Sequence, residues 1–474
     1  MWYVPPWPPS SPVSAFRDRR TRLSRALAPS CALIASGQRR SKNYPANTFP
    51  FRADSHFLYL VGQSIPGAAL LLGGNEPELF VPPTSSDDVI WTGPTLDEDE
   101  LGAKLELPVR PLPDLPDRLR DLRDMHTEVA TVSPNEEATA EWLTRTLGRR
   151  IEARRGAALA DGSADARLAD ALIDLRLPHD EAAVAQLSHA AIVTHGAHVA
   201  GMEATRPGIY EAEVSAAMVG AIMKAGLTVS YEPIVTVHGE VLHNETHHNQ
   251  VAAGDLVLAD VGAETPEGFA GDVTRVWPAN GRFSATQRAI YDLVLDTQQH
   301  AISLVRPGMR YRSIHEGAAR RMLAGLVDLG IFRGSVDGLA ERGAHALFFP
   351  HGVGHLLGVD VHDMEDLGDR AGYAPGRARP VRFGDCYLRL DRDLKRGMAV
   401  TIEPGFYRIP ALLEDQELTA PFEADLDRDT LARFSDVRGI RIEDDVLVTD
   451  DGAEVLTAHI PKEAAAVEQL VAGR

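Results

Sequence analysis

The sequence has very few cysteines and lacks long hydrophobic runs. Cys31 and Cys386 are the 2 cysteines in 474 residues, which excludes a disulfide framework and a cysteine-based zinc site. No apolar run approaches the roughly 20 residues that a membrane-spanning helix needs. Few cysteines are typical of proteins in a reducing compartment. These absences favour a protein of the cytoplasm that does not enter a membrane.

Basic residues are also in the minority, and several catalytic motifs are missing. The 48 Lys and Arg against 68 Asp and Glu give a net charge of -20, which argues against nucleic acid or an anionic membrane as a partner. The sequence contains no P-loop, no G-x-S-x-G elbow and no C-x-x-C pair. Nucleotide-binding, serine-hydrolase and thiol-redox functions therefore have no support.

The chain is long enough for two or three domain-sized units, and its pattern changes near residue 178. Residues 1–14 are broken by prolines and lack a basic start, so we expect an extended arm that packs on a neighbour and not a signal peptide. The rest of 1–178 alternates short apolar segments with helical patterns, which predicts an α/β domain. It has no metal-ligand pattern of its own. Residues 179–474 form the second predicted domain.

Within the first domain, we expect strands and one clearly delimited helix. The helix would take Ser133 as its N-cap, with Pro134 at its first position, Glu136 completing a capping box and Gly148 at its end. The expected strands are 32–35, 57–61, 68–72 and 79–81. In the second domain, helices are expected from about 180 to 203 and from about 210 to 224.

Four carboxylates and one imidazole in the second domain are the most informative feature: Asp260, Asp272, His355, Glu403 and Glu443. Together they can hold two divalent cations. Hard oxygen donors with one nitrogen suit Mn, and Zn or Co are also possible. Two neighbouring cations can share a bridging water, lower its pKa and polarise a carbonyl, as amide hydrolysis requires. The protein is therefore predicted to be a hydrolase.

The segments around these residues read as strands that each present a carboxylate to a shared face. Residues 256–260 alternate, and 271–277 read as the returning strand of a hairpin. Residues 397–403 form a strand stopped by a Pro-Gly pair, and 439–449 form another. In the last, Ile440 and Ile442 would face one way and the charged residues between them the other.

Six ordered blocks of this region carry a family resemblance: 260–264, 271–275, 351–358, 360–363, 401–405 and 439–445. They resemble the pita-bread metallopeptidases, which include Xaa-Pro aminopeptidase, Xaa-Pro dipeptidase (prolidase) and methionine aminopeptidase. The resemblance implies a curved antiparallel sheet with outer helices, preceded by a creatinase/prolidase-like α/β domain. It also implies that the first domain covers one side of the active-site cleft and supports a homodimer.

The resemblance also assigns roles to residues. Asp260, Asp272, His355, Glu403 and Glu443 would be metal ligands, with Asp272 and Glu443 bridging two ions. A metal-bridged hydroxide would attack the scissile carbonyl while Glu403 carries the proton to the leaving nitrogen. His351 and His362 would contact the substrate or stabilise the tetrahedral intermediate. His243 would bind the substrate, and Arg441 would orient Glu403 or the substrate.

Other histidines are given no such role. His189, His195 and His198 follow an alanine-rich helical pattern and are expected on the surface. His315 with Glu316 begins like a zincin helix, but position 319 is alanine, so the second histidine of that motif is missing.

The substrate is expected to be a small peptide with proline at its second position. An Xaa-Pro bond is a tertiary amide without an N–H, which ordinary peptidases handle poorly. Arg389 falls where prolidases carry the arginine that clamps a terminal carboxylate, and the insertion between Tyr407 and Gly439 also resembles prolidases. The main prediction is therefore Xaa-Pro dipeptidase, and the alternative is an Xaa-Pro aminopeptidase acting on longer peptides.

Two further classes remain as alternatives. Some pita-bread relatives have lost their metals and serve as catalytically inactive binding modules, and creatinase-type hydrolases work without a dinuclear site. Because all five ligand residues are intact, both alternatives are disfavoured. The loop 364–380 has no recognised counterpart in the family, and we expect it either to gate the cleft or to be disordered.

Overall fold

The computed structural model describes residues 10–73, 76–84, 89–91, 93, 96–153 and 159–473. These residues form two compact units, and each is described separately. The N-terminal unit comprises 10–183 and 364–371, and the C-terminal unit comprises 184–363 and 372–473. Most of the proposed N-terminal arm, residues 1–9, lies outside the described residues. Among the described helices, none combines the length and apolarity needed to cross a membrane.

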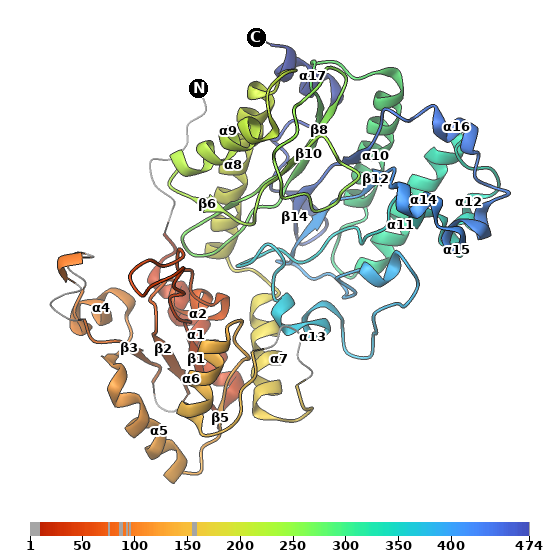
Figure 1. The fold of residues 1–474 in the computed structure, drawn as a ribbon. Coiled ribbons are helices and arrows are strands. Elements are labelled where there is room, and N and C mark those ends of the chain that lie inside the picture. Colours follow the sequence, from red (N-terminus) through yellow and green to blue (C-terminus); the bar gives the residue numbers. More distant parts are fainter. Residues whose placement is uncertain are drawn as a thin grey trace. The chain divides into compact units, whose positions relative to one another are not determined.

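The N-terminal unit is built around a five-stranded mixed sheet of order β4-β3-β2-β1-β5 (Figure 1). β1 runs antiparallel to β2 and parallel to β5, and β3 is antiparallel to β2 and parallel to β4. The strands are β1 Cys31–Ala35, β2 Ala69–Leu72, β3 Glu78–Val81, β4 Val109–Pro111 and β5 Val129–Ala130. The helices are α1 Val13–Leu27, α2 Ser55–Val61, α4 Glu98–Leu105, α5 Leu115–Asp124, α6 Glu137–Leu147 and α7 Ala164–Arg176.

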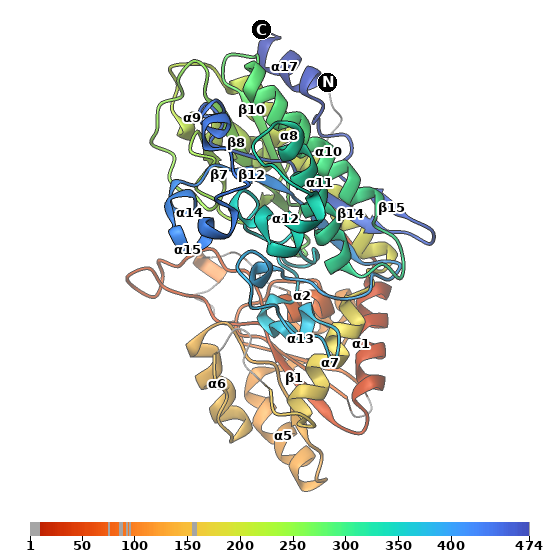
Figure 2. The ribbon, with the colours of Figure 1, turned by 90° about the vertical axis from the view of Figure 1, so that its right-hand side faces the viewer.

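Helices cover both faces of this sheet, as Figure 2 shows. On one face, Leu33, Leu71 and Phe80 pack against Leu119 of α5 and Leu143 of α6. On the other, α1 and α2 contact β1, and α1 packs along α7. β1, β2 and β3 are therefore buried on both faces, and their side chains point alternately to one face and the other because extended chain repeats every two residues. The predicted α/β domain is confirmed.

Two local predictions in this unit are wrong. Residues 57–61 belong to α2 and not to a strand, because Asp54 caps the helix by accepting hydrogen bonds from the backbone N–H groups of His56 and Phe57. The helix expected from Pro134 begins instead at Glu137, and Ser133 does not cap it. Its end is correct, since Gly148 adopts the left-handed conformation of a helix C-cap.

The strands of the C-terminal unit are short and pair in antiparallel fashion. Three sheets have the orders β10-β8-β7, β11-β14-β15 and β12-β13, and β6 pairs with β9. The strands are β6 Thr228–Val229, β7 Ile234–Thr236, β8 Leu256–Asp260, β9 Ala263–Glu264, β10 Thr274–Pro278, β11 Ala399–Ile402, β12 Gly405–Tyr407, β13 Gly439–Arg441, β14 Asp444–Val448 and β15 Ala453–Val455. The expected hairpin of 256–260 with 271–277 is confirmed as the β8/β10 pair.

Long helices lie on the outside of these strands, with α10 and α11 side by side (Figures 1 and 2). The two expected helices are confirmed as α8 and α9. The helices and 3₁₀ turns are α8 Glu181–Ala204, α9 Glu211–Lys224, α10 Ala285–Ser303, α11 Tyr311–Asp328, α12 Val336–Arg342, η2 Ala344–Leu347, η4 Asp385–Tyr387, α14 Pro410–Glu414, α15 Gln416–Thr419, η5 Ala420–Phe422, α16 Arg428–Ala432 and α17 Ala464–Ala472. A short helix, α13 Asp369–Gly372, lies almost wholly in the N-terminal unit.

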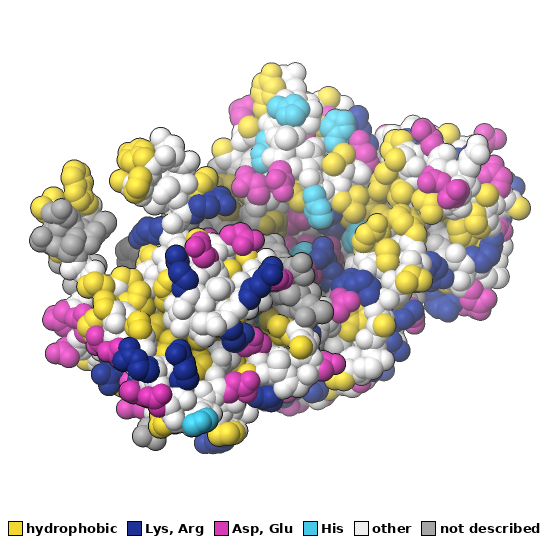
Figure 3. Space-filling model, turned by 60° about the horizontal axis from the view of Figure 1, so that its bottom comes forward, with side chains coloured by type: hydrophobic (Ala, Val, Ile, Leu, Met, Phe, Trp, Pro, Cys, Tyr) yellow, Lys and Arg dark blue, Asp and Glu magenta, His cyan; other side chains and the backbone are white. Residues whose placement is uncertain are grey.

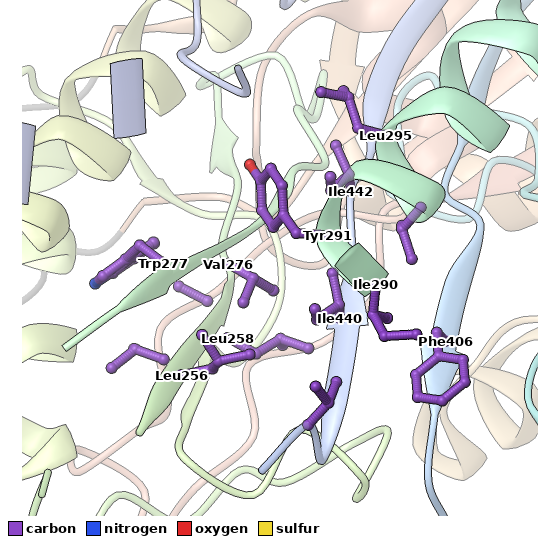
Figure 4. Packing of buried hydrophobic residues seen from close by; sticks show 14 of the residues in the cluster. Leu256, Leu258, Val276, Trp277, Ile290, Tyr291, Leu295, Phe406, Ile440 and Ile442 are labelled. Carbon is purple, nitrogen blue, oxygen red and sulfur yellow. The ribbon is translucent and has the colours of Figure 1, made fainter. Parts of the chain in front are cut away.

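A hydrophobic core between sheet and helices fixes the strands (Figure 4). Leu258 and Val276 of the β8/β10 pair, Ile440 of β13 and Ile290 of α10 are all labelled there and are buried. Trp277 is fully buried, and its indole N–H donates to the Thr205 hydroxyl over 2.8 Å. Burying a large aliphatic side chain contributes about 1.5–3 kcal/mol. This core positions the strand ends that carry the polar residues.

One strand prediction needs correction. Residues 439–449 do not form a single strand but two, β13 and β14, which pair with β12 and β11 respectively. Ile442 and Glu443 lie at the break between them. Of the loop 364–380, residues 364–371 belong to the N-terminal unit, where Arg370 forms an ion pair with Asp170.

Among the described side chains on the face seen in Figure 3, basic and acidic groups are interspersed. The acidic side chains behind the net charge of -20 therefore do not form a single patch on this face.

The exact domain boundary expected between residues 178 and 179 stays a prediction.

Candidate metal centre

Four of the five predicted ligand residues lie at or near strand ends, and the fifth lies on a loop. Asp260 is the last residue of β8 and pairs with Thr274 of β10, so Asp272 precedes β10 by only two residues. Glu403 directly follows β11. Glu443 lies between β13 and β14, where its backbone N–H donates to the Thr274 carbonyl over 3.1 Å. This bond ties the two halves of the cluster together.

His355 enters from a loop that is held against β11. Its backbone N–H donates to the Thr401 hydroxyl over 3.1 Å, and the Thr401 N–H donates back to the His355 carbonyl over 3.0 Å. Gly354 is necessary for this approach, because a Cβ there would overlap the Thr401 carbonyl oxygen and the Tyr311 hydroxyl. The glycine therefore lets the histidine reach the strand.

The cluster is buried and rich in acid. Asp260, Asp272, His355 and Glu443 are buried, and Glu403 retains 17% side-chain exposure. His355 Nε2 lies 3.3 Å from an Asp272 oxygen and 3.6 Å from a Glu403 oxygen. One ligand atom each from Asp272, His355 and Glu443 lies within 4.8 Å of the others, a spacing that could hold a metal ion. Buried charges are costly unless they are paired or bind a cation.

The electrostatics show that three of the four carboxylates lack sufficient positive charge, whereas His355 and the Tyr231 hydroxyl lower the pKa of the fourth, Asp272, against the effect of burial. Burial and the negative charges of Asp272, Glu403 and Asp260 raise the pKa of Glu443 well above its ordinary value. Burial likewise raises the pKa of Glu403 to about 7 and that of Asp260 to about 6. A divalent cation would relieve this repulsion, because it favours the charged form of every carboxylate it contacts. The residues present therefore fit a divalent metal site.

The orientation of His355 supports the same conclusion. Its Nδ1 lies 3.0 Å from the Leu356 carbonyl, which can only accept, so Nδ1 carries a proton and Nε2 faces the carboxylates. Although burial opposes protonation, Asp272 and Glu403 raise the pKa of His355 to about 9. A metal-ligating histidine commonly donates its other N–H to such a carbonyl. Nε2 is thus the atom available to a cation.

Several residues that support the cluster were missed from the sequence. The Tyr231 hydroxyl contacts carboxylate oxygens of Asp260 and Asp272, the latter at 2.7 Å. The Thr274 hydroxyl donates to Glu443 over 2.8 Å. Tyr231 lies outside the six recognised blocks, so nothing in the sequence pattern distinguished it. Thr274 lies in the block 271–275, but threonine is common in strands and its hydroxyl carried no separate signal.

Arg441 forms hydrogen bonds with three groups around the cluster and also lines the pocket over it, so its expected role stays a prediction. Its guanidinium donates to Asp260 over 2.6 Å, to the Thr274 hydroxyl over 2.8 Å and to the Tyr407 hydroxyl over 2.9 Å. Orientation of Glu403 or substrate was the expectation from the resemblance. The observed bonds place the arginine behind Asp260, where its charge offsets part of the acid excess.

A pocket of about 390 Å³ opens over the cluster. Its volume lies within the range of small-ligand sites. All four predicted substrate-side residues line it, namely His243, His351, His362 and Arg389. The His362 ring lies 4.0 Å from that of His355, centroid to centroid. The pocket wall also contains apolar side chains that were not predicted: Leu242, Phe383, Tyr387, Ile409 and Leu412.

His351 is held in a defined tautomer at this pocket. Its Nδ1 lies 2.8 Å from the Gly352 carbonyl, and its Nε2 lies 2.9 Å from the Tyr407 hydroxyl. Burial lowers the pKa of His351 to about 3, so the ring is neutral. Nδ1 therefore donates to the carbonyl and Nε2 accepts from Tyr407.

Three histidines expected at the surface are buried instead. His189, His195 and His198 are 4%, 4% and 0% exposed. The ring Nε2 of His198 lies 3.1 Å from the Val261 carbonyl, and the His195 ring packs edge-on against His459. Their helix, α8, packs into the unit because its alanines allow close approach, so the prediction from the polar character of histidine was wrong.

Together, the fold and this buried acidic cluster define a metal-dependent peptidase of the pita-bread class. Residues 185–450 match the description "Metallopeptidase family M24", and residues 16–130 match "Aminopeptidase P, N-terminal domain". The chain belongs to metallopeptidase family M24. The predicted resemblance and two-domain fold are thereby confirmed.

Known proteins resemble the chain over nearly its whole length. A Xaa-Pro aminopeptidase of Haemophilus influenzae is 31% identical over 467 residues, covering 97% of each chain. The structure of Pseudomonas aeruginosa aminopeptidase PepP is 30% identical with a TM-score of 0.81 and covers 98% of each chain. The structure of Escherichia coli aminopeptidase P with the inhibitor Pro-Leu is 28% identical with a TM-score of 0.78, covering 98% of this chain and 99% of the other.

Proposed function

We propose that this protein is an Xaa-Pro aminopeptidase, which releases the N-terminal residue from peptides with proline in second place. The observation that carries the proposal is the full-length similarity to a Xaa-Pro aminopeptidase, together with the buried acidic cluster at the base of the pocket. The main sequence prediction, Xaa-Pro dipeptidase, gains no specific support from these relatives. Its alternative is therefore the better supported function.

Asp260, Asp272, His355, Glu403 and Glu443 would hold two divalent cations. Four carboxylates and one imidazole suit Mn²⁺ first, with Zn²⁺ and Co²⁺ as further options. When bound, the cations would lower the pKa of a water molecule and polarise the scissile carbonyl. Asp272 and Glu443 are proposed to bridge the two ions, which agrees with their short distance from His355 Nε2 and from each other.

The remaining residues are assigned by their positions in the pocket. Glu403 is the most exposed of the cluster and lines the pocket, so we assign it the transfer of a proton to the leaving imino nitrogen. His243, His351 and His362 line the same pocket and would contact the peptide. Because proline nitrogen carries no N–H, recognition has to use groups that do not accept a hydrogen bond from it. Arg441 is proposed to orient Asp260.

The structure of the Escherichia coli relative contains Pro-Leu, a dipeptide that begins with proline. A product of this kind would remain after an aminopeptidase removed the residue before proline from a tripeptide. By analogy, the pocket of this chain would accept residues beyond proline, and Arg389 would contact that extension or its carboxylate. A homodimer, Mn²⁺ as the physiological metal and a cytoplasmic location stay predictions.

The test compares substrates of increasing length. Mn²⁺-loaded protein is assayed with Ala-Pro, Ala-Pro-Gly and Ala-Pro-Gly-Gly, and released alanine is quantified by mass spectrometry. We expect higher kcat/KM for the longer peptides, with an intact product that begins with proline. Preference for Ala-Pro that is lost in Arg389→Ala but kept in the control Arg396→Ala would establish the dipeptidase instead. Arg396 is a suitable control because its side chain is 73% exposed.

A further inference from the structure

A second buried cluster of metal-ligand type lies in the C-terminal unit. His315 comes from α11, His345 from the 3₁₀ turn η2 and Asp385 from the 3₁₀ turn η4. The three residues are 2%, 3% and 7% exposed. One ligand atom from each lies within 4.8 Å of the others. None of the three belongs to the five-residue cluster described above.

The two imidazole rings are not satisfied by hydrogen bonds. The Nε2 atoms of His315 and His345 lie 3.7 and 3.6 Å from the same Asp385 oxygen, Oδ1. Both distances exceed the normal N–H···O range. Among the residues that the structure describes, neither nitrogen of either buried ring has a hydrogen-bond partner. Leaving a buried polar atom without a partner costs about 1–3 kcal/mol, so four such atoms in one place call for an explanation.

The spacing matches a metal site. In a tetrahedral zinc site with bonds of about 2.0–2.2 Å, neighbouring ligand atoms are about 3.3–3.6 Å apart. The two Nε2···Oδ1 distances, 3.7 and 3.6 Å, therefore lie at or just above the upper end of this range. The ligand atoms of the two imidazoles lie within 4.8 Å of each other, so the rings would move inward to complete the tetrahedron.

Neighbouring residues orient the Asp385 carboxylate toward the two imidazoles. Arg382 donates from Nε and Nη2 to the other Asp385 oxygen, Oδ2, over 2.8 and 2.7 Å. Oδ1 is thereby left to face the two imidazoles. Gly384 brings the turn close to η2, since a Cβ at Gly384 would lie 2.6 Å from that of Ala346. The neutral imidazole is the form that binds a metal.

We propose that His315 Nε2, His345 Nε2 and Asp385 Oδ1 bind a Zn²⁺ ion at a third metal site, separate from the dinuclear centre. Two imidazoles and one carboxylate are zinc ligands, and a water would take the fourth position. The second oxygen of the carboxylate, held by Arg382, supplies the supporting contact that such ligands usually have.

A zinc ion at this site would stabilise one wall of the pocket. Phe383, Tyr387 and Arg389 line the pocket and lie within four residues of Asp385. A bound ion would fix their segment to α11 and η2. The role is structural, and the proposal does not depend on the peptidase reaction.

The experiment measures zinc stoichiometry in full-length protein. The double variant Asp272→Asn, Glu443→Gln removes bridging carboxylates of the dinuclear centre. After Zn²⁺ loading and desalting, we expect about three zinc ions per chain in the parent protein and about one in the double variant. Adding His345→Ala or Asp385→Asn to the double variant should reduce retained zinc to near zero, whereas adding His300→Ala, an exposed histidine of α10, should not.

Two further measurements, thermal stability and cobalt absorption, test the site without using enzyme activity and without relying on a single variant. Zn²⁺ should raise the Tm of the double variant by about 4 °C or more, and this gain should disappear with His345→Ala. Co²⁺ in the double variant should give the visible absorption of a tetrahedral site. Only two zinc ions in the parent, or none in a folded double variant, would overturn the third site while leaving the proposed function untouched.

Discussion

Buried charges are arranged differently in the two units. In the N-terminal unit, two buried basic side chains are matched with carboxylates: Arg19 pairs with Asp180 at 2.8 Å and His56 with Asp366 at 3.0 Å. In the C-terminal unit, four carboxylates gather around one histidine and one arginine. Paired charges satisfy one another, whereas an excess of one sign needs a further ion. The difference separates ion pairs that serve structure from a site built to bind cations.

The same contrast appears between two neighbouring residues, Glu443 and Asp444. Although burial would raise it, Arg275 and Lys462 lower the pKa of Asp444, while the pKa of Glu443 is raised. Arg275 lies 2.8 Å from an Asp444 oxygen, and both side chains are fully buried. One carboxylate is therefore structural and the next is available to a metal.

The largest expected effect is the loss of activity when the proposed bridging carboxylates are removed. Glu443→Gln or Asp272→Asn should reduce kcat/KM by at least about three orders of magnitude, because the cations would lose a bridging ligand. Glu443→Gln should unfold no more easily than the metal-free parent, since one like charge is gone. Asp272→Asn should destabilise the metal-free protein, because His355 and the Tyr231 hydroxyl hold the pKa of Asp272 below its ordinary value despite burial. Steady-state assays and urea denaturation measure both, with the exposed Asp451→Asn as control. Parent-like activity in Glu443→Gln would contradict the metal assignment.

The paired carboxylate should behave in the opposite way. Asp444→Asn is expected to destabilise the protein by about 3 kcal/mol, because it leaves the Arg275 guanidinium buried without its partner. The effect should be present without metal. Urea denaturation of metal-free protein measures it, and a change below about 0.5 kcal/mol would remove the distinction between the two neighbours.

The N-terminal pair should give a pH-dependent contribution. Against the effects of burial, His56 lowers the pKa of Asp366 to about 2, and Asp366 raises that of His56. The depressed carboxyl stabilises above its unfolded pKa of about 4 and loses this effect as the pH falls toward 2. The raised imidazole stabilises below its unfolded pKa of about 6.5 and loses this effect as the pH rises through its folded pKa.

Asp366→Asn should therefore cost most between about pH 4 and 6.5, on the order of 2 kcal/mol. The difference in unfolding free energy from the parent, measured across that range and at pH 8.5, reports it. Asp161→Asn is the control, because Asp161 is 99% exposed and its ion pair should contribute little. A cost that does not change with pH would show that the pair is not charged as described.

Tyr231→Phe should give the smallest change. The hydroxyl contacts both Asp260 and Asp272, so its loss should weaken Mn²⁺ binding by about tenfold while activity at saturating Mn²⁺ falls less. Activity titrations with Mn²⁺ separate the two effects. An unchanged midpoint would mean that Tyr231 does not orient the ligands.

The sequence predicted the site better than the details of the fold. The five ligand-type residues converge as expected, because each is fixed to a strand end or to a glycine-bearing loop whose pattern is visible in the sequence. The helix at 55–61 was missed because its apolar residues also fit a strand, and Asp54 alone signalled the cap. The break at Ile442 and Glu443 was invisible because it depends on strand partners distant in sequence.

Supporting residues were harder still to predict. Tyr231 and Thr274 act through hydroxyl contacts that only the fold creates. His315 and His345 meet Asp385 from separate segments, and no spacing rule connects residues 315, 345 and 385. His315 attracted notice only through an incomplete zincin motif, which gave the wrong partners.

Anomalous diffraction from Mn²⁺-soaked crystals tests the central claim most directly. If the acidic cluster forms a dinuclear centre, two manganese peaks about 3.5–4 Å apart should lie among Asp260, Asp272, His355, Glu403 and Glu443, with Asp272 and Glu443 touching both. No peak at this cluster, in crystals of protein that Mn²⁺ activates, would contradict it.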